Sequence, residues 1–307
     1  MLFGMNRRAI GLCGLAPIAW ASLAAAAPES TAPVAPPSSS EPSASSPLPK
    51  TPTAPPEADA VHPEQTKDVR SEVPNYAYSY TAYGATEKTL GVQVYGLGVG
   101  AAGQRGILGG GLTVWGSPID RLTLIGDGQR NLYGNFAPSA ALVVRLLGKS
   151  DAGWSLGGLG KFKVEGFGDG KPIGAGTRPA TPGEIESEIE TGILLSYAKS
   201  GGLHFDLNAI TGVGTGEDGE IDEEGRLRLG YDVTHLVRLG IDGQARARLN
   251  GPKYLPNGKT WDFAAGPQAI FGSKSFFGSL TGGPATMGLL GDHIGWNAIA
   301  SVGGTTF

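Results

Sequence analysis

The sequence has little cysteine, little histidine and little net charge, and each shortage excludes a class of function. The single cysteine, Cys13, cannot form an internal disulfide. A net charge of −4 with 17% charged residues provides no basic surface for a nucleic acid partner. No segment after residue 27 has the roughly 20 consecutive apolar residues of a membrane-spanning helix.

Glycine and proline are abundant, and they divide the chain. Residues 1–27 have the pattern of a secretory signal peptide: Arg7 and Arg8, then an apolar run, then four alanines. Half of the 22 prolines lie between Pro28 and Pro63, mixed with Ser, Ala and Thr. This composition cannot bury a core, so we expect residues 28–74 to be a disordered tether. The remaining 75–307 hold most of the 51 glycines, which suit tightly turned strands better than helices.

The stretch from residue 225 to 250 shows the pattern that the rest of the chain repeats. Charged side chains alternate with apolar ones along both of its arms, and a short polar joint at residues 232–235 separates the arms. A period of two indicates β-strands, so the stretch predicts an antiparallel hairpin with one apolar and one charged face.

Alternation predicts an all-β fold of twelve strands, a single transmembrane antiparallel up-and-down barrel. The predicted strands are 88–99, 106–116, 120–129, 135–148, 154–167, 184–199, 202–214, 225–233, 236–250, 259–271, 274–283 and 293–307. Every second connection is tight and the others are longer, a rhythm typical of outer-membrane barrels with short periplasmic turns and longer outer loops.

The apolar face decides between two architectures. A soluble barrel would turn that face inward, whereas a membrane barrel would turn it toward lipid. We expect lipid outside, because charges in the apolar phase occur only at predicted strand ends. Aromatic residues also gather at strand ends, as two belts. Trp115, Trp154 and Tyr231 belong to the inner belt, and Trp261 and Trp296 to the outer.

These features together resemble the outer-membrane β-barrel (porin-like) proteins of Gram-negative bacteria. The resemblance rests on the signal sequence, the glycine-rich amphipathic strands, the YDVT turn at residues 231–234 and a last strand that ends in Phe307. It implies location in the outer membrane with its lipid, a periplasmic N-terminal tether, and Phe307 as part of the signal read by the barrel-assembly machinery. Phe307 is out of phase with Trp296, Ala298, Ala300 and Val302 of the last strand, so either a bulge forms at Gly303 and Gly304 or the signal is imperfect.

If the apolar face meets lipid, the charged face lines the lumen. The lumen-lining candidates are Lys161, Lys163, Glu184, Glu186, Glu188, Glu190, His204, Asp206, Arg226, Arg228, Arg238, Asp242, Arg246 and Arg248. The glutamates form a ladder on one strand, beside Lys161 and Lys163 across the preceding hairpin, and the arginines gather on another hairpin. One expectation is walls of opposite sign; the alternative is that these side chains pair with one another and fill the lumen. The first expectation favours passive passage of small polar or charged solutes. The alternative is a non-conducting barrel that acts as an envelope anchor or assembly partner.

No catalytic, metal or cofactor site is expected. Only His204 lies mid-strand and inward, near Asp206 and across from Ser196, and no motif spacing supports a nucleophile there. The acidic residues 216–225 match no calcium-loop pattern and indicate a solvated loop. The tyrosine-rich residues 75–86 fit three readings equally: an extra strand, a lumen insert, or the end of the tether.

Overall fold

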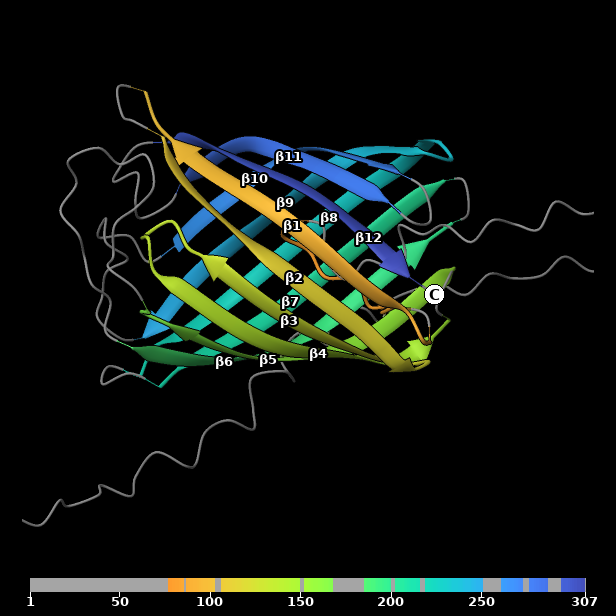
Figure 1. Cartoon of the computed structure of the whole chain (residues 1–307), viewed down its shortest axis with the longest axis horizontal. Helices are drawn as coiled ribbons and strands as arrows, with labels where there is room; N and C mark the ends of the chain where they lie inside the picture. Colours follow the sequence, from red (N-terminus) through yellow and green to blue (C-terminus); the bar gives the residue numbers. More distant parts are fainter. Residues whose placement is uncertain are drawn as a thin grey trace, which may run out of the picture. The chain divides into compact units, whose positions relative to one another are not determined.

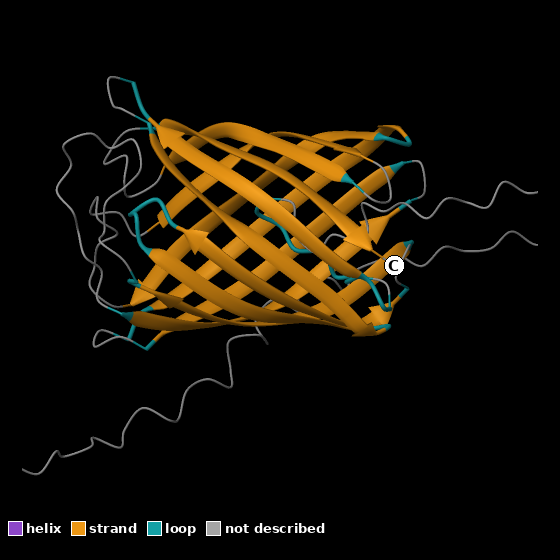
Figure 2. Cartoon of the chain, viewed as in Figure 1, coloured by secondary structure: helices purple, strands orange, loops and turns teal. Residues whose placement is uncertain are grey.

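The structure, a computed structural model, describes residues 77–85, 87–102, 106–149, 152–167, 185–199, 202–215, 219–250, 261–272, 276–286 and 294–306. All regular elements within these residues are β-strands (Figure 2), and no described helix has the length and hydrophobicity of a membrane span. The strands are β1 (Leu90–Gly100), β2 (Ile107–Ile119), β3 (Leu122–Arg130), β4 (Phe136–Gly148), β5 (Gly153–Glu165), β6 (Glu186–Ala198), β7 (Leu203–Gly214), β8 (Ile221–Thr234), β9 (Val237–Asn250), β10 (Trp261–Gly272), β11 (Phe277–Thr286) and β12 (Gly295–Thr306).

The twelve strands close into one antiparallel barrel (Figure 1). Consecutive strands pair in chain order, and β1 completes the ring by pairing with β12 from Leu90↔Thr306 to Gly100↔Trp296. Closure leaves no strand edge with unpaired backbone groups. The predicted twelve-stranded barrel is confirmed, since each predicted strand overlaps one observed strand.

The apolar side chains point outward. On β7, Leu207 is 44% exposed while its neighbour Asp206 is 2% exposed, and on β9 Ile241 is 50% exposed while Asp242 is 1% exposed. The same alternation places at least one exposed large apolar side chain on each of the twelve strands, aliphatic on most of them and aromatic on β5 and β10. A soluble barrel would bury this surface, so the exterior suits acyl chains.

Two expectations about single elements are wrong. Trp115, expected in an aromatic belt, is 1% exposed inside the barrel, where its ring centroid lies 6.0 Å from that of Phe277. Side chains alternate along β2, so Trp115 must face inward because its neighbour Val114 faces outward. Gly91, which pairs with Trp115, has no side chain and leaves space for the indole. Strand β8 begins at Ile221, so the last part of the expected acidic loop is strand.

The expected bulge at Gly303 and Gly304 is also wrong. Gly303 pairs with Gln93 and with Phe277 without any register shift on either side of β12. A Cβ at Gly303 would lie 2.5 Å from the Phe277 ring, so this glycine makes room for an aromatic side chain. Register shifts occur instead in the β2–β3, β4–β5 and β8–β9 pairs. Phe307, like residues 1–76, lies outside the described residues.

Candidate functional site

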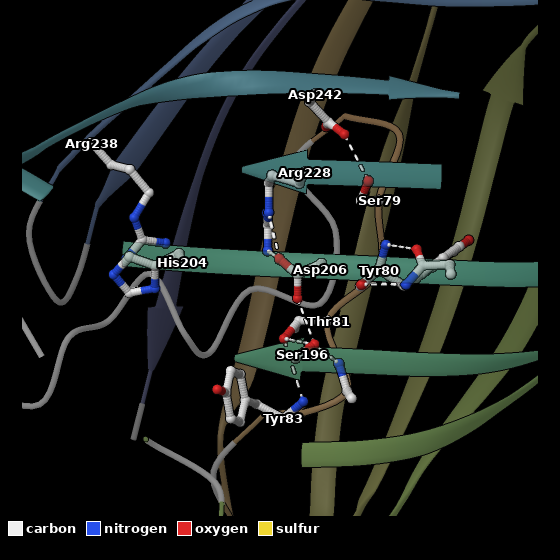
Figure 3. Close-up of polar contacts among 12 residues, drawn as sticks. Ser79, Tyr80, Thr81, Tyr83, Ser196, His204, Asp206, Arg228, Arg238 and Asp242 are labelled. Carbon is white, nitrogen blue, oxygen red and sulfur yellow. Dashed lines mark hydrogen bonds and ion pairs between the residues drawn. The ribbon is translucent and has the colours of Figure 1, made fainter. Parts of the chain in front are cut away.

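A segment without regular secondary structure, residues 77–85, lies inside the barrel, and we call it the strap. Its residues from Tyr78 to Tyr83 are all at most 7% exposed. Of the three readings of the tyrosine-rich segment, the structure selects the lumen insert. Figure 3 shows the strap running past strands of the wall, with its polar groups directed at wall side chains.

The strap amides bond to wall side chains instead of to a neighbouring strand. Four of its N–H groups donate to oxygen atoms of four different strands. These bonds are Tyr78 to Asp242 Oδ2 (3.1 Å), Tyr80 to Asn208 Oδ1 (2.7 Å), Ala82 to Ser196 Oγ (2.7 Å) and Ala85 to Thr123 Oγ1 (2.7 Å). Because buried N–H groups are costly to leave unpaired, this pattern fixes both the path and the phase of the strap.

Cationic and amide side chains of the wall bind the strap carbonyls. Arg226 donates to the carbonyl of Tyr78 at 2.9 Å, Arg145 to that of Tyr83 at 2.8 Å, and Asn208 Nδ2 to that of Tyr80 at 2.9 Å. The Arg226 guanidinium also lies over the Tyr80 ring, 5.1 Å from its centroid. Arg226, predicted as a lumen charge, therefore also positions the strap.

Strap side chains add further contacts. The Ser79 hydroxyl donates to Asp242 Oδ1 at 2.7 Å, so this one carboxylate accepts from two consecutive strap residues. The Tyr78 hydroxyl donates to Asn297 Oδ1. Burial, and then the nearby Asp242 carboxylate, raises the pKa of the Tyr78 phenol above its ordinary value. This hydroxyl therefore stays protonated, and able to donate, at neutral pH.

An apolar patch inside the lumen receives the strap. Tyr80, Ala82 and Ala85 pack in one buried cluster with inward-facing side chains of eight strands. The wall members include Val143, Leu159, Leu194, Ile210, Ile270 and Phe277. Burial of apolar surface is worth about 25 cal/mol per Å², so the strap is held by hydrophobic contacts as well as by hydrogen bonds.

Many lumen charges form pairs between neighbouring strands. These include Lys161–Glu190 (2.8 Å), Lys163–Glu188 (2.5 Å), Arg228–Asp206 (2.6 Å) and Arg238–Asp232 (2.9 Å), whereas Arg226–Glu224 (2.8 Å) lies within β8. Arg246 and Arg248 both pair with Asp222, which was expected in a solvated loop. The predicted walls of opposite sign are therefore wrong: acidic and basic side chains neutralise one another along the wall.

Ser196 lies opposite Asp206 and binds the strap, whereas His204 is the second residue of β7 and lies opposite Ala198, so the expected position mid-strand and across from Ser196 is wrong. Ser196 donates to Asp206 at 2.5 Å and accepts from the Ala82 amide. His204 Nε2 lies 2.7 Å from an oxygen of Asp232 and 2.6 Å from an Arg238 nitrogen. A serine nucleophile needs a base as its hydrogen-bond partner, whereas this hydroxyl bonds a carboxylate and the strap.

A cavity of about 430 Å³ lies on one side of the strap, and we call it the vestibule. Its lining includes the strap residues Ala77, Tyr78 and Tyr80, the residues 131–133 that connect β3 to β4, and residues from nine strands. Lys161, Lys163, Glu188, Glu190, Arg226 and Arg246 are predicted lumen residues that line it. The volume is that of a site for a small organic solute.

Comparisons with known proteins agree with the fold. No protein-family model and no curated protein matches the chain. Among solved structures, the NanC porin matches with a TM-score of 0.50 and 9% identity, over 69% of this chain and 98% of that one. The chain has the outer-membrane β-barrel fold. An outer-membrane channel from Pseudomonas putida F1 matches with a TM-score of 0.49 and 13% identity, over 76% of this chain and 100% of that one.

The other predicted site residues of this outer-membrane barrel lie around the strap or at the strand ends. Arg228, Asp206 and Asp242 are buried beside the strap, and His204 and Arg238 form a buried group with Asp232. Glu186 is exposed at the start of β6, and Arg248 pairs with Glu220 and Asp222. Glu184 lies outside the described residues. No group of three or more His, Cys, Asp or Glu among the described side chains could hold a metal.

Sequence reasoning missed the neutral residues that bind the strap. Asn208, Ser196 and Thr123 each accept a strap amide, and all three occupy the inward phase of their strands. The inward apolar residues were missed too, because the lumen was expected to be polar throughout. The sequence did carry a signal for them. The outer faces of β4 and β5 were assigned, and Val143 and Leu159 stand in the opposite phase, which points inward.

Proposed function

We propose that the protein is an outer-membrane channel for small polar solutes that the strap closes. The supporting observation is the vestibule: a polar cavity of about 430 Å³ whose lining includes the strap itself. Removing the strap would expose the polar side chains that now bind it, among them Asp242, Asn208 and Arg226. Passage then requires the strap to leave its place. The apolar exterior and the fold shared with the NanC porin support the same reading.

A second candidate is a non-conducting barrel that serves as an envelope anchor or assembly partner. The burial of the strap favours it, because a permanently filled lumen passes nothing. The two candidates differ in whether the strap can move.

A disulfide lock separates the candidates. An ideal Cβ built on Gly157 of β5 lies 3.3 Å from the Cβ of Ala82 in the strap, close to the roughly 3.5–4.5 Å of a disulfide. The variant Ala82→Cys/Gly157→Cys can therefore be locked by oxidation. The one native cysteine, Cys13, falls in the predicted signal peptide and does not interfere.

The measurement is planar-bilayer conductance of the full folded protein before and after reduction. A strap-closed channel gives no openings when oxidised, and openings return with the reductant. The single variant Ala82→Cys, treated identically, controls for the substitution. Openings from the oxidised, locked protein would show that the strap is not the barrier. No openings from wild type or reduced protein at any voltage would favour the non-conducting barrel.

A further inference from the structure

One carboxylate of the vestibule differs from all the others. Asp127 of β3 lines the cavity and accepts hydrogen bonds from Thr113 at 2.7 Å and from the Tyr95 hydroxyl at 3.2 Å. Within the described part of the chain, no Lys or Arg nitrogen lies within 4 Å of it. Two hydroxyls hold the carboxylate in place without cancelling its charge.

Every other charged side chain of the vestibule is paired. The lining holds the cations Lys161, Lys163, Arg226 and Arg246 and the carboxylates Asp127, Glu165, Glu188, Glu190 and Glu224. Each of the four cations lies within 4 Å of at least one carboxylate other than Asp127. An anionic solute would have to break one of these pairs, whereas a cationic solute meets at Asp127 a carboxylate that is bonded to hydroxyls and not to a described Lys or Arg.

The surroundings of Asp127 also suit an organic cation. The phenol rings of Tyr80, Tyr95 and Tyr133 line the same cavity, and Tyr80 already carries the Arg226 guanidinium over its face. Aromatic faces attract ammonium groups. The Tyr95 hydroxyl has a single proton, so a carboxylate with about four acceptor positions keeps capacity for a further donor.

We propose that the vestibule binds small solutes that bear an ammonium group, with Asp127 as the anchor of that group. Gln93 of β1 and Gln129 of β3, the strand of Asp127, also line the cavity, and their amides can bind polar parts of the solute. This inference rests on the proposed function in one respect: it names the class of solute that the channel would admit. Binding of such a solute in the vestibule does not itself require that the solute passes through the barrel.

The test is isothermal titration calorimetry on the full folded protein in detergent, with putrescine as the probe. Wild type binds putrescine but not succinate, a dianion of the same carbon number, and not the neutral 1,4-butanediol. Asp127→Asn keeps the size and the hydroxyl partners but removes the charge. We expect its affinity for putrescine to fall at least about tenfold, the value of one charged hydrogen bond.

Glu165→Gln is the matched control. It removes one negative charge from the same lining, but from a carboxylate that already pairs with Lys163 at 2.7 Å. We expect its affinity to stay within about threefold of wild type, as for a screened pair. Equal losses in the two variants would overturn the anchor role of Asp127, and absence of putrescine binding by wild type would overturn the site. Heat-modifiable gel mobility verifies that each variant folds, and either result leaves the conductance test of the channel intact.

Discussion

Replacing Asp242 by asparagine should loosen the strap with little change of shape. Asp242 accepts three hydrogen bonds, from the Ser79 hydroxyl at 2.7 Å and from the Tyr78 amide and Gln268 Nε2 at 3.1 Å. An asparagine can keep all three contacts: its oxygen accepts from Tyr78 N–H and Gln268 Nε2, and its amino group donates to the Ser79 hydroxyl. The charge is lost, so the two bonds to the strap are no longer charge-assisted.

The size of the effect follows from these bonds. A hydrogen bond to a charged group contributes about 1.5–3 kcal/mol and a neutral one about 0.5–1.5 kcal/mol. Asparagine makes both strap bonds neutral, so we take about 2–3 kcal/mol for the strap. Since about 1.4 kcal/mol is a factor of ten, the equilibrium between closed and open strap shifts by roughly 30-fold to 140-fold.

The assay is single-channel open probability in planar bilayers at fixed voltage. Asp222→Asn is the control, because Asp222 is a buried lumen carboxylate whose partners Arg246 and Arg248 lie on β9 and not on the strap. We expect Asp242→Asn to open far more often than wild type and Asp222→Asn to differ little. Equal behaviour of the two variants would refute the reasoning, because lumen charge alone would then control opening.

Two further predictions concern the outer and inner faces of the wall. Leu207 lies on the outward face at the middle of β7, so Leu207→Lys should destabilise the folded barrel in lipid vesicles by about 2–4 kcal/mol. The control Thr306→Lys, at a strand end, should cost at most about 1 kcal/mol. Urea titration measures both free energies of unfolding, and equal effects would contradict the lipid-facing assignment. In single-tryptophan variants, brominated lipids should quench Trp154, which is 59% exposed, and leave Trp115, which is 1% exposed, unaffected; quenching of Trp115 would place it outside.

The fold was predictable because one physical rule governs every strand. A closed barrel with lipid outside imposes a period of two, so the alternation around Leu207 and Ile241 determines both the strand and its outer face. Errors arose where that rule was not applied strictly. Trp115 was grouped with the belts for its position near a strand end, although its phase is inward.

The candidate site was only partly predictable. The charged lumen residues were found by phase, and the glutamate ladder was expected beside Lys161 and Lys163. The individual partners depend on the register between strands, which the sequence of one strand does not specify: Lys161 pairs with Glu190 because β5 and β6 align these two positions. The strap could not be distinguished from a strand, since Tyr78, Ser79 and Tyr80 alternate in either case. Only the wall groups that accept its amides, such as Asn208, decide its place.

Hydrogen exchange of the strap amides tests the central claim most directly, namely that residues 77–85 are bound inside the lumen. In the folded, detergent-solubilised protein, the amides of Tyr78, Tyr80, Ala82 and Ala85 each donate to a buried wall side chain. We predict that a peptide covering the strap exchanges as slowly as peptides from the strands. Exchange at the rate of an unstructured peptide would contradict the account, because the lumen would then be free of the strap.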